Sequence, residues 1–168
     1  RGQQGLEQGL AVVDDQRAIT EARRRHETHP RGTRGRMKEA EGVDALIDLT
    51  TPDLNRDVRF IQEVSRASGV HVVVATGIWR DPPRSFAARD IDASADIFVR
   101  EIEVGIDNTS IKAGAIKVAN DEDGISPAHE RVLRAAARAS RRTGCPISTH
   151  HWAQGQEGRE QLRVFLEE

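Results

Sequence analysis

Lys117 is the residue whose setting in the sequence points most directly to chemistry. It stands in an apolar run between Ile116 and Val118, where a lysine is rarely found buried unless it is paired or modified. If the run is a strand, alternation places Lys117 on one face with Ala115 and Ala119, which are small enough to leave room for a long side chain. A buried lysine that loses its proton can form a Schiff base or take up CO2 as a carbamate. The alternative is an edge lysine whose amine reaches solvent.

His150 is the second candidate, because it closes the apolar run Pro146–His150. On a strand it shares a face with Ser148. Parallel α/β proteins place their chemistry at the carboxyl ends of strands, and a neutral imidazole there can ligate a metal or act as a base. A purely structural histidine is the alternative. Lys117 and His150 at matching depth on consecutive strands favour a shared site.

The remaining candidates have weaker patterns. His151 follows the strand and is placed in a loop, and Asp48 is either a buried hydrogen-bond partner of a ligand or a turn residue. His26 and His29 lack the glutamate of a zincin helix, so no metal site is expected there. Others are assigned ordinary structural roles: surface histidines, loop or helix-start acids, and a buried small side chain, namely His71, His129, Asp53, Asp57, Asp81 and Cys145.

Four short apolar runs bounded by turn formers predict strands. They are Asp44–Thr50, His71–Thr76, Gly114–Ala119 and Pro146–His150. Apolar residues at helical spacing predict helices between and after them, over Asn55–Ser68, Ile91–Ile106, Ser126–Thr143 and Gly158–Glu167. The third helix is the best marked, with Ser126 as N-cap, Pro127 at the first helical position and Gly144 after its end. The alternation predicts a parallel sheet, either doubly wound or a consecutive part of a (β/α)8 barrel.

Residues 1–35 do not continue this pattern. Gln16–Arg25 is a possible helix, no strand is evident before it, and Thr28–Gly35 is loop-like. We therefore divide the chain into an N-terminal segment, residues 1–35, helical or disordered, and an α/β domain, residues 36–168. The first residue is not methionine, so we expect either processing or a piece of a longer protein.

Composition limits the classes of partner. The 168 residues have 31% charged and 37% hydrophobic side chains and a net charge of −2, which is typical of a globular domain and gives no reason to expect nucleic acid. One basic cluster, around Arg23–Arg25 and Arg31–Arg36, lacks aromatic neighbours. No apolar run approaches the roughly 20 residues that span a bilayer, and no signal peptide is evident. The single cysteine fits a reducing cytoplasm.

Several blocks of the sequence, in a consistent order from about Gly42 to Glu168, resemble the phosphotriesterase family, which includes the phosphotriesterase-like lactonases. The blocks are GVDALIDLTTPDLNRDV, VHVVVATGIWRDPP, FVREIEVGI, IKAGAIKVA and HERVLRAAARASRRTGCPISTH. The resemblance implies a (β/α)8 barrel that holds two divalent metal ions, most often zinc, at the carboxyl end of its strands. It implies that Lys117 is carboxylated and bridges both metals, that His150 binds the second metal, and that Trp79 lies near the substrate pocket and a homodimer contact. The implied substrates are small lactones or phosphotriesters, attacked by a metal-bridging hydroxide.

The departures from the family pattern are as informative. The family has a His-x-His pair on its first strand, and no His-x-His occurs in this sequence. By the same mapping the chain holds strands two to five, and the family's later histidine and aspartate have no counterpart. We therefore expect a partial barrel with little or no hydrolase activity alone. The alternatives are a non-catalytic, self-associating half-barrel remnant, and an unrelated α/β domain that uses Lys117 as a Schiff-base amine.

Overall fold

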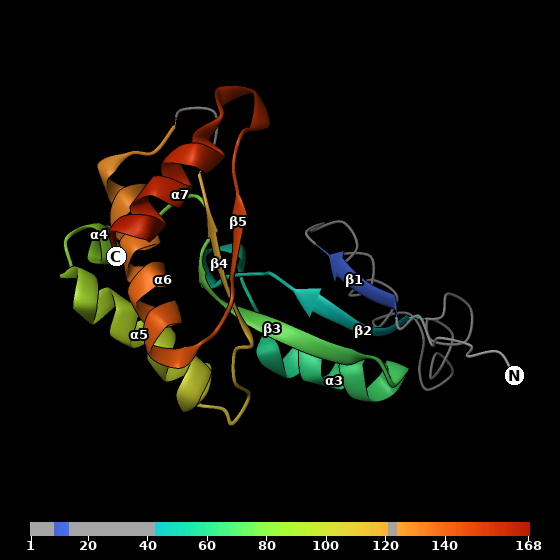
Figure 1. Ribbon diagram of the computed structural model, residues 1–168. Coiled ribbons are helices and arrows are strands. Elements are labelled where there is room, and N and C mark those ends of the chain that lie inside the picture. The colour runs from blue at the N-terminus through green and yellow to red at the C-terminus, as the bar shows by residue number, and fades with distance from the viewer. Residues whose placement is uncertain (1–8, 14–42, 121–123) are drawn as a thin grey trace, which may run out of the picture. The chain divides into compact units, whose positions relative to one another are not determined.

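The computed structural model describes residues 9–13, 43–120 and 124–168, and the chain divides into two compact units (Figure 1). The first unit comprises Arg1–Asp48 and Arg59–Val73, and the second comprises Leu49–Val58 and Val74–Glu168. Several expectations fall outside the described residues: the helix over Gln16–Arg25, the loop over Thr28–Gly35, the basic cluster, and the pair His26 and His29. The division of the chain at residue 35 remains a prediction.

The first unit contains a strand that the sequence analysis did not anticipate. Strand β1, Gly9–Val13, pairs in parallel with β2, Val43–Asp48, and the register shifts between Gly9 and Leu10. The expectation that no strand precedes residue 16 was therefore wrong. Helix α3, Val58–Ser68, and the start of β3, His71–Ile78, follow. Gly69, at φ +72, follows the last residue of the helix. Glycine is common at this position because it adopts left-handed backbone without strain.

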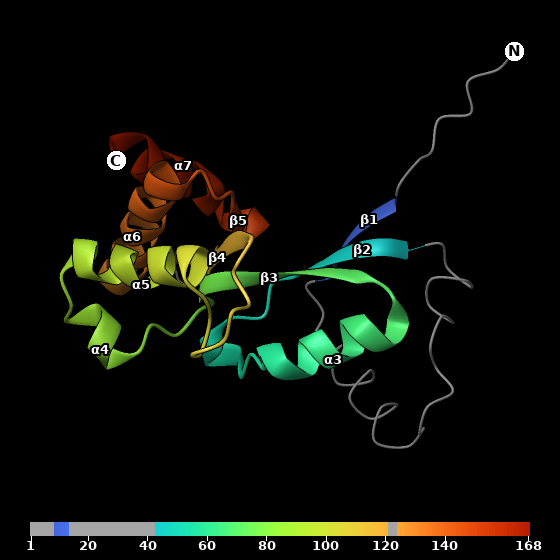
Figure 2. The same cartoon turned by 90° about the horizontal axis from the view of Figure 1, so that it is seen from below.

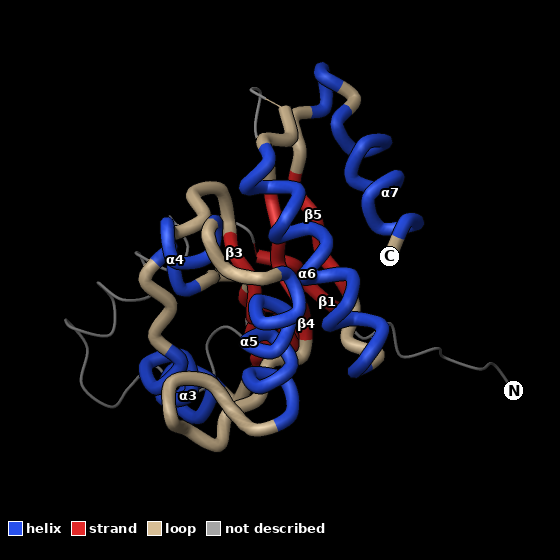
Figure 3. The backbone as a smooth tube through the Cα atoms, turned by 90° about the vertical axis from the view of Figure 1, so that its left-hand side faces the viewer, coloured by secondary structure: helices blue, strands red, loops and turns tan. Residues whose placement is uncertain are grey.

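The second unit holds three strands paired in chain order, all parallel. The end of β3 pairs with β4, Ala115–Ala119, and β4 pairs with β5, Ile147–His150. Helices lie between and after them, and Figure 3 shows α6 running along β4 and β5. The helical segments are η1 Pro52–Leu54, α4 Arg84–Ala87, α5 Ile91–Glu103, α6 Pro127–Thr143, η2 Ala153–Gly155 and α7 Glu157–Glu167. Consecutive parallel strands with intervening helices confirm the expected fold class, an α/β partial (β/α)8 barrel.

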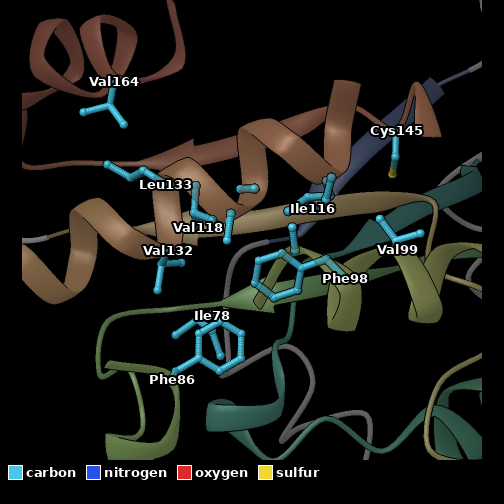
Figure 4. Packing of buried hydrophobic residues seen from close by; sticks show 14 residues of the cluster. Ile78, Phe86, Phe98, Val99, Ile116, Val118, Val132, Leu133, Cys145 and Val164 are labelled. Carbon is cyan, nitrogen blue, oxygen red and sulfur yellow. The ribbon is translucent and has the colours of Figure 1, made fainter. Parts of the chain in front are cut away.

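One face of these strands forms the hydrophobic core of the second unit. Ile116 and Val118 are fully buried and face helices α5 and α6, where Phe98 and Leu133 meet them (Figure 4). The two helices pack side by side (Figure 2). Burying each such side chain stabilises the fold by about 1.5–3 kcal/mol. Since strand side chains alternate, this packing leaves Lys117 on the opposite face from the core.

Helix α6 begins and ends as its sequence predicts. The Ser126 hydroxyl accepts from the His129 N–H at 3.2 Å, Pro127 occupies the first turn, and Gly144 adopts φ +72 after the last residue. His129 lies at the surface, as expected, and has in addition a role in the helix cap that the sequence did not indicate. Its Nδ1 accepts from the Ser126 N–H at 3.3 Å, which completes a capping box with histidine in the usual place of glutamate.

Two other helices are shorter than expected. The helix predicted over Asn55–Ser68 starts only at Val58, because Asn55 adopts φ +59 and closes η1. The helix predicted over Ile91–Ile106 ends at Glu103. No helix among the described residues has the length and apolarity needed to cross a membrane.

Candidate metal and substrate site

Three neighbouring strands bring the predicted site residues to one face of the second unit. In the strand register Gly77 lies beside Lys117, and Lys117 lies beside Ser148. His150 is two residues beyond Ser148 and pairs with Ala119, so it stands on the same face one step nearer the carboxyl ends of the strands. The expected shared face of Lys117 and His150 is therefore present.

Lys117 is buried, with 1% of its surface exposed. The alternative of an edge lysine whose amine reaches solvent was therefore wrong. Its strand neighbours Ala115 and Ala119 are also buried, as is Ala75 on β3. Across from Lys117 the chain has Gly77 at φ +119, where a Cβ would lie 1.9 Å from the Lys117 carbonyl oxygen. Gly77 thus lets β3 approach the Lys117 backbone closely, and the lysine has small, buried neighbours along its own strand.

Trp79 links the lysine to the histidine. The Lys117 Nζ lies 4.9 Å from the centroid of a Trp79 ring, within the range of a cation–π contact. On the other side, the rings of Trp79 and His150 have centroids 5.0 Å apart and an interplanar angle of 40°. All three residues proposed from the sequence therefore meet, with the indole in contact with both of the others.

The turn that carries Trp79 is held by two side chains. The Asp53 carboxylate accepts the Trp79 N–H with both oxygens, at 3.1 and 3.0 Å. The next carbonyl, that of Arg80, lies 2.7 Å from the His129 Nε2. Because Nδ1 of the same ring accepts from Ser126, the neutral ring carries its proton on Nε2 and donates it to Arg80. Asp53 was expected to be an ordinary loop or helix-start acid, because acids are common at such positions.

The backbone of His150 is fixed by two buried residues, Asn120 and Gln161, for which the sequence had suggested no role. Its carbonyl accepts from the Asn120 N–H at 3.1 Å and from the Gln161 Nε2 at 2.9 Å. The Gln161 amide donates in addition to the Asn120 Oδ1. Asn120 and Gln161 are 0% and 1% exposed, and buried amides paired in this way hold a strand end in one position.

The remaining candidates have different outcomes. Asp48 is 5% exposed at the end of β2, and its role beside a ligand remains a prediction. His151 lies in the loop after β5, as expected, with its ring beside Gly158, where a Cβ would be 2.8 Å from the Nε2. Cys145 is buried, and burial raises the pKa of its thiol, which agrees with its assignment as a small apolar side chain.

Lys117 and His150 do not by themselves form a metal centre. Over residues 9–13, 43–120 and 124–168, no three His, Cys, Asp or Glu side chains gather closely enough to hold an ion. Lys117 and His150 supply two donors on one face, whereas a catalytic zinc needs three protein ligands. A buried lysine with small neighbours does suit a carbamate. The structure thus places Lys117, Trp79 and His150 on one face at the carboxyl ends of parallel strands.

Comparison with known proteins identifies the family. A sequence profile of the phosphotriesterase family matches residues 13–168, so the match reaches into the segment that we had left unassigned. The chain belongs to the phosphotriesterase family. This excludes the hypothesis of an unrelated α/β domain.

Three similar proteins illustrate the range of names within the matches. The chain is 46% identical over 143 residues to a phosphotriesterase homology protein of Mycobacterium tuberculosis, covering 80% of this chain and 44% of that protein. It is 44% identical over 129 residues to the aryldialkylphosphatase of Saccharolobus solfataricus, covering 76% and 41%. It is 34% identical over 113 residues to the N-acetyltaurine hydrolase of Bos taurus, covering 66% and 32%. The chain therefore spans less than half the length of these relatives.

Proposed function

We propose that this chain contributes part of the active site of a metal-dependent hydrolase that acts on small esters, either lactones or phosphotriesters. The observation that carries the proposal is the buried Lys117, held on the face opposite the core with Trp79 between it and His150. The names of the relatives include an aryldialkylphosphatase, which supports a phosphoester substrate. A carbonyl substrate is equally compatible with the N-acetyltaurine hydrolase among them.

Each of the three residues has a defined part in this proposal. Lys117, as a carbamate, would present two anionic oxygens to two cations, and His150 would ligate one of them through a ring nitrogen. The metal pair, most often zinc, would lower the pKa of a water that attacks phosphorus or a carbonyl carbon. Trp79 forms an apolar wall beside these ligands and would orient the organic part of the ester.

The 168-residue polypeptide is expected to have little or no activity on its own. Its described residues provide two donors, and two cannot hold a metal pair against water and competing ligands. The alternative is a non-catalytic chain that associates with itself. Leu162 and Leu166, one turn apart on α7, are 55% and 78% exposed, and this apolar strip favours association, including a homodimer. The single cysteine still favours a cytoplasmic setting.

The proposal is tested by metal content and hydrolysis together. The polypeptide is prepared with zinc, cobalt or manganese, and an aryl dialkyl phosphate and a lactone are offered as substrates. Any metal retention or turnover should fall in Lys117→Met and His150→Asn, and should persist in Lys112→Met, which removes the same charge from an exposed position. Measurable metal retention that is equal in all four proteins would refute a site built on Lys117 and His150.

A further inference from the structure

Asp53 accepts a hydrogen bond from a backbone N–H beyond the end of strand β3, outside the regular strand pairing. Strand β3 ends at Ile78, which is the last β3 residue registered with β4. The next N–H, that of Trp79, donates to both oxygens of the Asp53 carboxylate, 26 positions earlier in the chain. A charged acceptor makes a stronger bond than a neutral carbonyl would.

The segment that carries Asp53 is itself firmly anchored. Thr51 and Arg56, on either side of η1, are 0% and 8% exposed. The Arg56 guanidinium donates to the Ala75 carbonyl at 2.7 Å and forms two bonds to the Glu101 carboxylate, at 2.8 and 2.7 Å. Within η1 the Asn55 N–H bonds the Pro52 carbonyl at 3.0 Å. The backbone on both sides of Asp53 is therefore held in place by buried residues and hydrogen bonds.

Hydrogen bonds hold the turn after β3 at two consecutive residues, Trp79 and Arg80. One partner precedes the turn in the sequence and the other follows it. Asp53 holds the Trp79 N–H, and His129, at the start of α6, holds the Arg80 carbonyl at 2.7 Å. Neither contact involves the indole, which is left to rest against Lys117 and His150. The two contacts thus fix the position of the backbone that carries the Trp79 ring.

We propose that Asp53 is a positioning residue, which fixes the turn after β3 so that the Trp79 indole stays between Lys117 and His150. Without this contact the turn would move, and the ring would uncover the lysine to water. The meaning of this position for catalysis rests on the proposed hydrolase function. The geometric inference itself can be tested without metal, substrate or turnover.

The test follows the indole by 19F NMR of protein labelled with 5-fluorotryptophan. Trp152→Phe is the background, because it leaves Trp79 as the one tryptophan. Asp53→Ala should raise the ratio of displaced to docked indole by about tenfold or more, as expected for loss of a hydrogen bond to a charged group. Asp53→Asn keeps one acceptor oxygen and should restore part of the docked signal. Asp81→Ala is the matched control, since it removes an exposed carboxylate two residues from Trp79 and should leave the signal unchanged.

Circular dichroism and thermal melting establish that each variant is folded. A folded Asp53→Ala protein with the parent's fluorine signal would overturn the proposal. If that variant does not fold, amide exchange in the unaltered chain decides: slow exchange of the Trp79 N–H supports the bond, and exchange at the rate of an unstructured amide overturns it. A chain with a docked indole, whose metal retention is the same in the parent and in Lys117→Met, would contradict the proposed function and leave this inference standing.

Discussion

Replacing Gly77 by alanine is the sharpest way to test how closely β3 and β4 approach each other at Lys117. Gly77 adopts φ +119, and a Cβ there would lie 1.9 Å from the carbonyl oxygen of Lys117 and 2.8 Å from its carbon and nitrogen. These are backbone atoms of β4, so they cannot rotate aside as the end of a flexible side chain would. Relief requires β3 to move away from β4 at the pair Gly77 and Lys117.

The cost has two parts. The left-handed backbone costs an alanine about 1–2 kcal/mol, and forcing a methyl group into a packed contact costs about 1–3 kcal/mol more. We therefore expect Gly77→Ala to lower the free energy of unfolding by about 3 kcal/mol. Gly144→Ala is the matched control, because Gly144 has φ +72 and nothing within 4 Å of its Cβ position. It should cost only about 1 kcal/mol.

The assay is urea unfolding followed by circular dichroism, with both variants compared at equal protein concentration. The fluorine signal of Trp79 gives a second readout, since displacement of β4 moves Lys117 relative to the indole. If Gly77→Ala costs no more than Gly144→Ala, the close approach of β3 and β4 at Gly77 and Lys117 is refuted.

Three further predictions concern the support of the site. Ser126→Ala should lower the free energy of unfolding by about 1 kcal/mol through loss of the α6 cap, measured by urea unfolding. Arg56→Met should cost about 3–5 kcal/mol, because it leaves the Glu101 carboxylate without its partner, and the double variant with Glu101→Leu should recover part of that loss; full additivity would argue against a coupled pair. Hydrogen bonding to Arg138 is the main factor that holds the pKa of Glu168 below its usual 4.5. That contribution to stability is therefore present above about pH 4.5 and lost as the pH falls through the lowered pKa, so thermal melts of Glu168→Gln should depend less on pH below 4.5 than those of the parent.

Elements with strong local patterns were predictable from the sequence. Helix α6 is an example, since Ser126, Pro127 and Gly144 each satisfy a requirement of a helix end that depends on no distant residue. The shared face of Lys117 and His150 was predictable for a similar reason. Alternation along each strand fixes the face, and sequential parallel pairing fixes the neighbours.

Features that depend on distant partners were not predictable in this way. Strand β1 is a short stretch, GLAVV, whose strand character depends on pairing with β2 more than 30 residues later. Asp53 resembles any loop acid until Trp79 is placed beside it, 26 positions on. Gln161 contacts Asn120 from 41 positions away, and the only local hint was its place one turn from Glu157 and Val164 on the buried side of α7.

Our central proposal is that Lys117 and His150 belong to one metal-binding site of a phosphotriesterase-family hydrolase. The most direct measurement is a cobalt(II) titration followed by visible absorption, with the parent chain, Lys117→Met, His150→Asn and the control His71→Asn, which removes an exposed imidazole at the start of β3. The account predicts weak binding by the parent, weaker binding in both site variants, and parental binding in the control. Binding of equal strength in the parent, Lys117→Met and His150→Asn would contradict it.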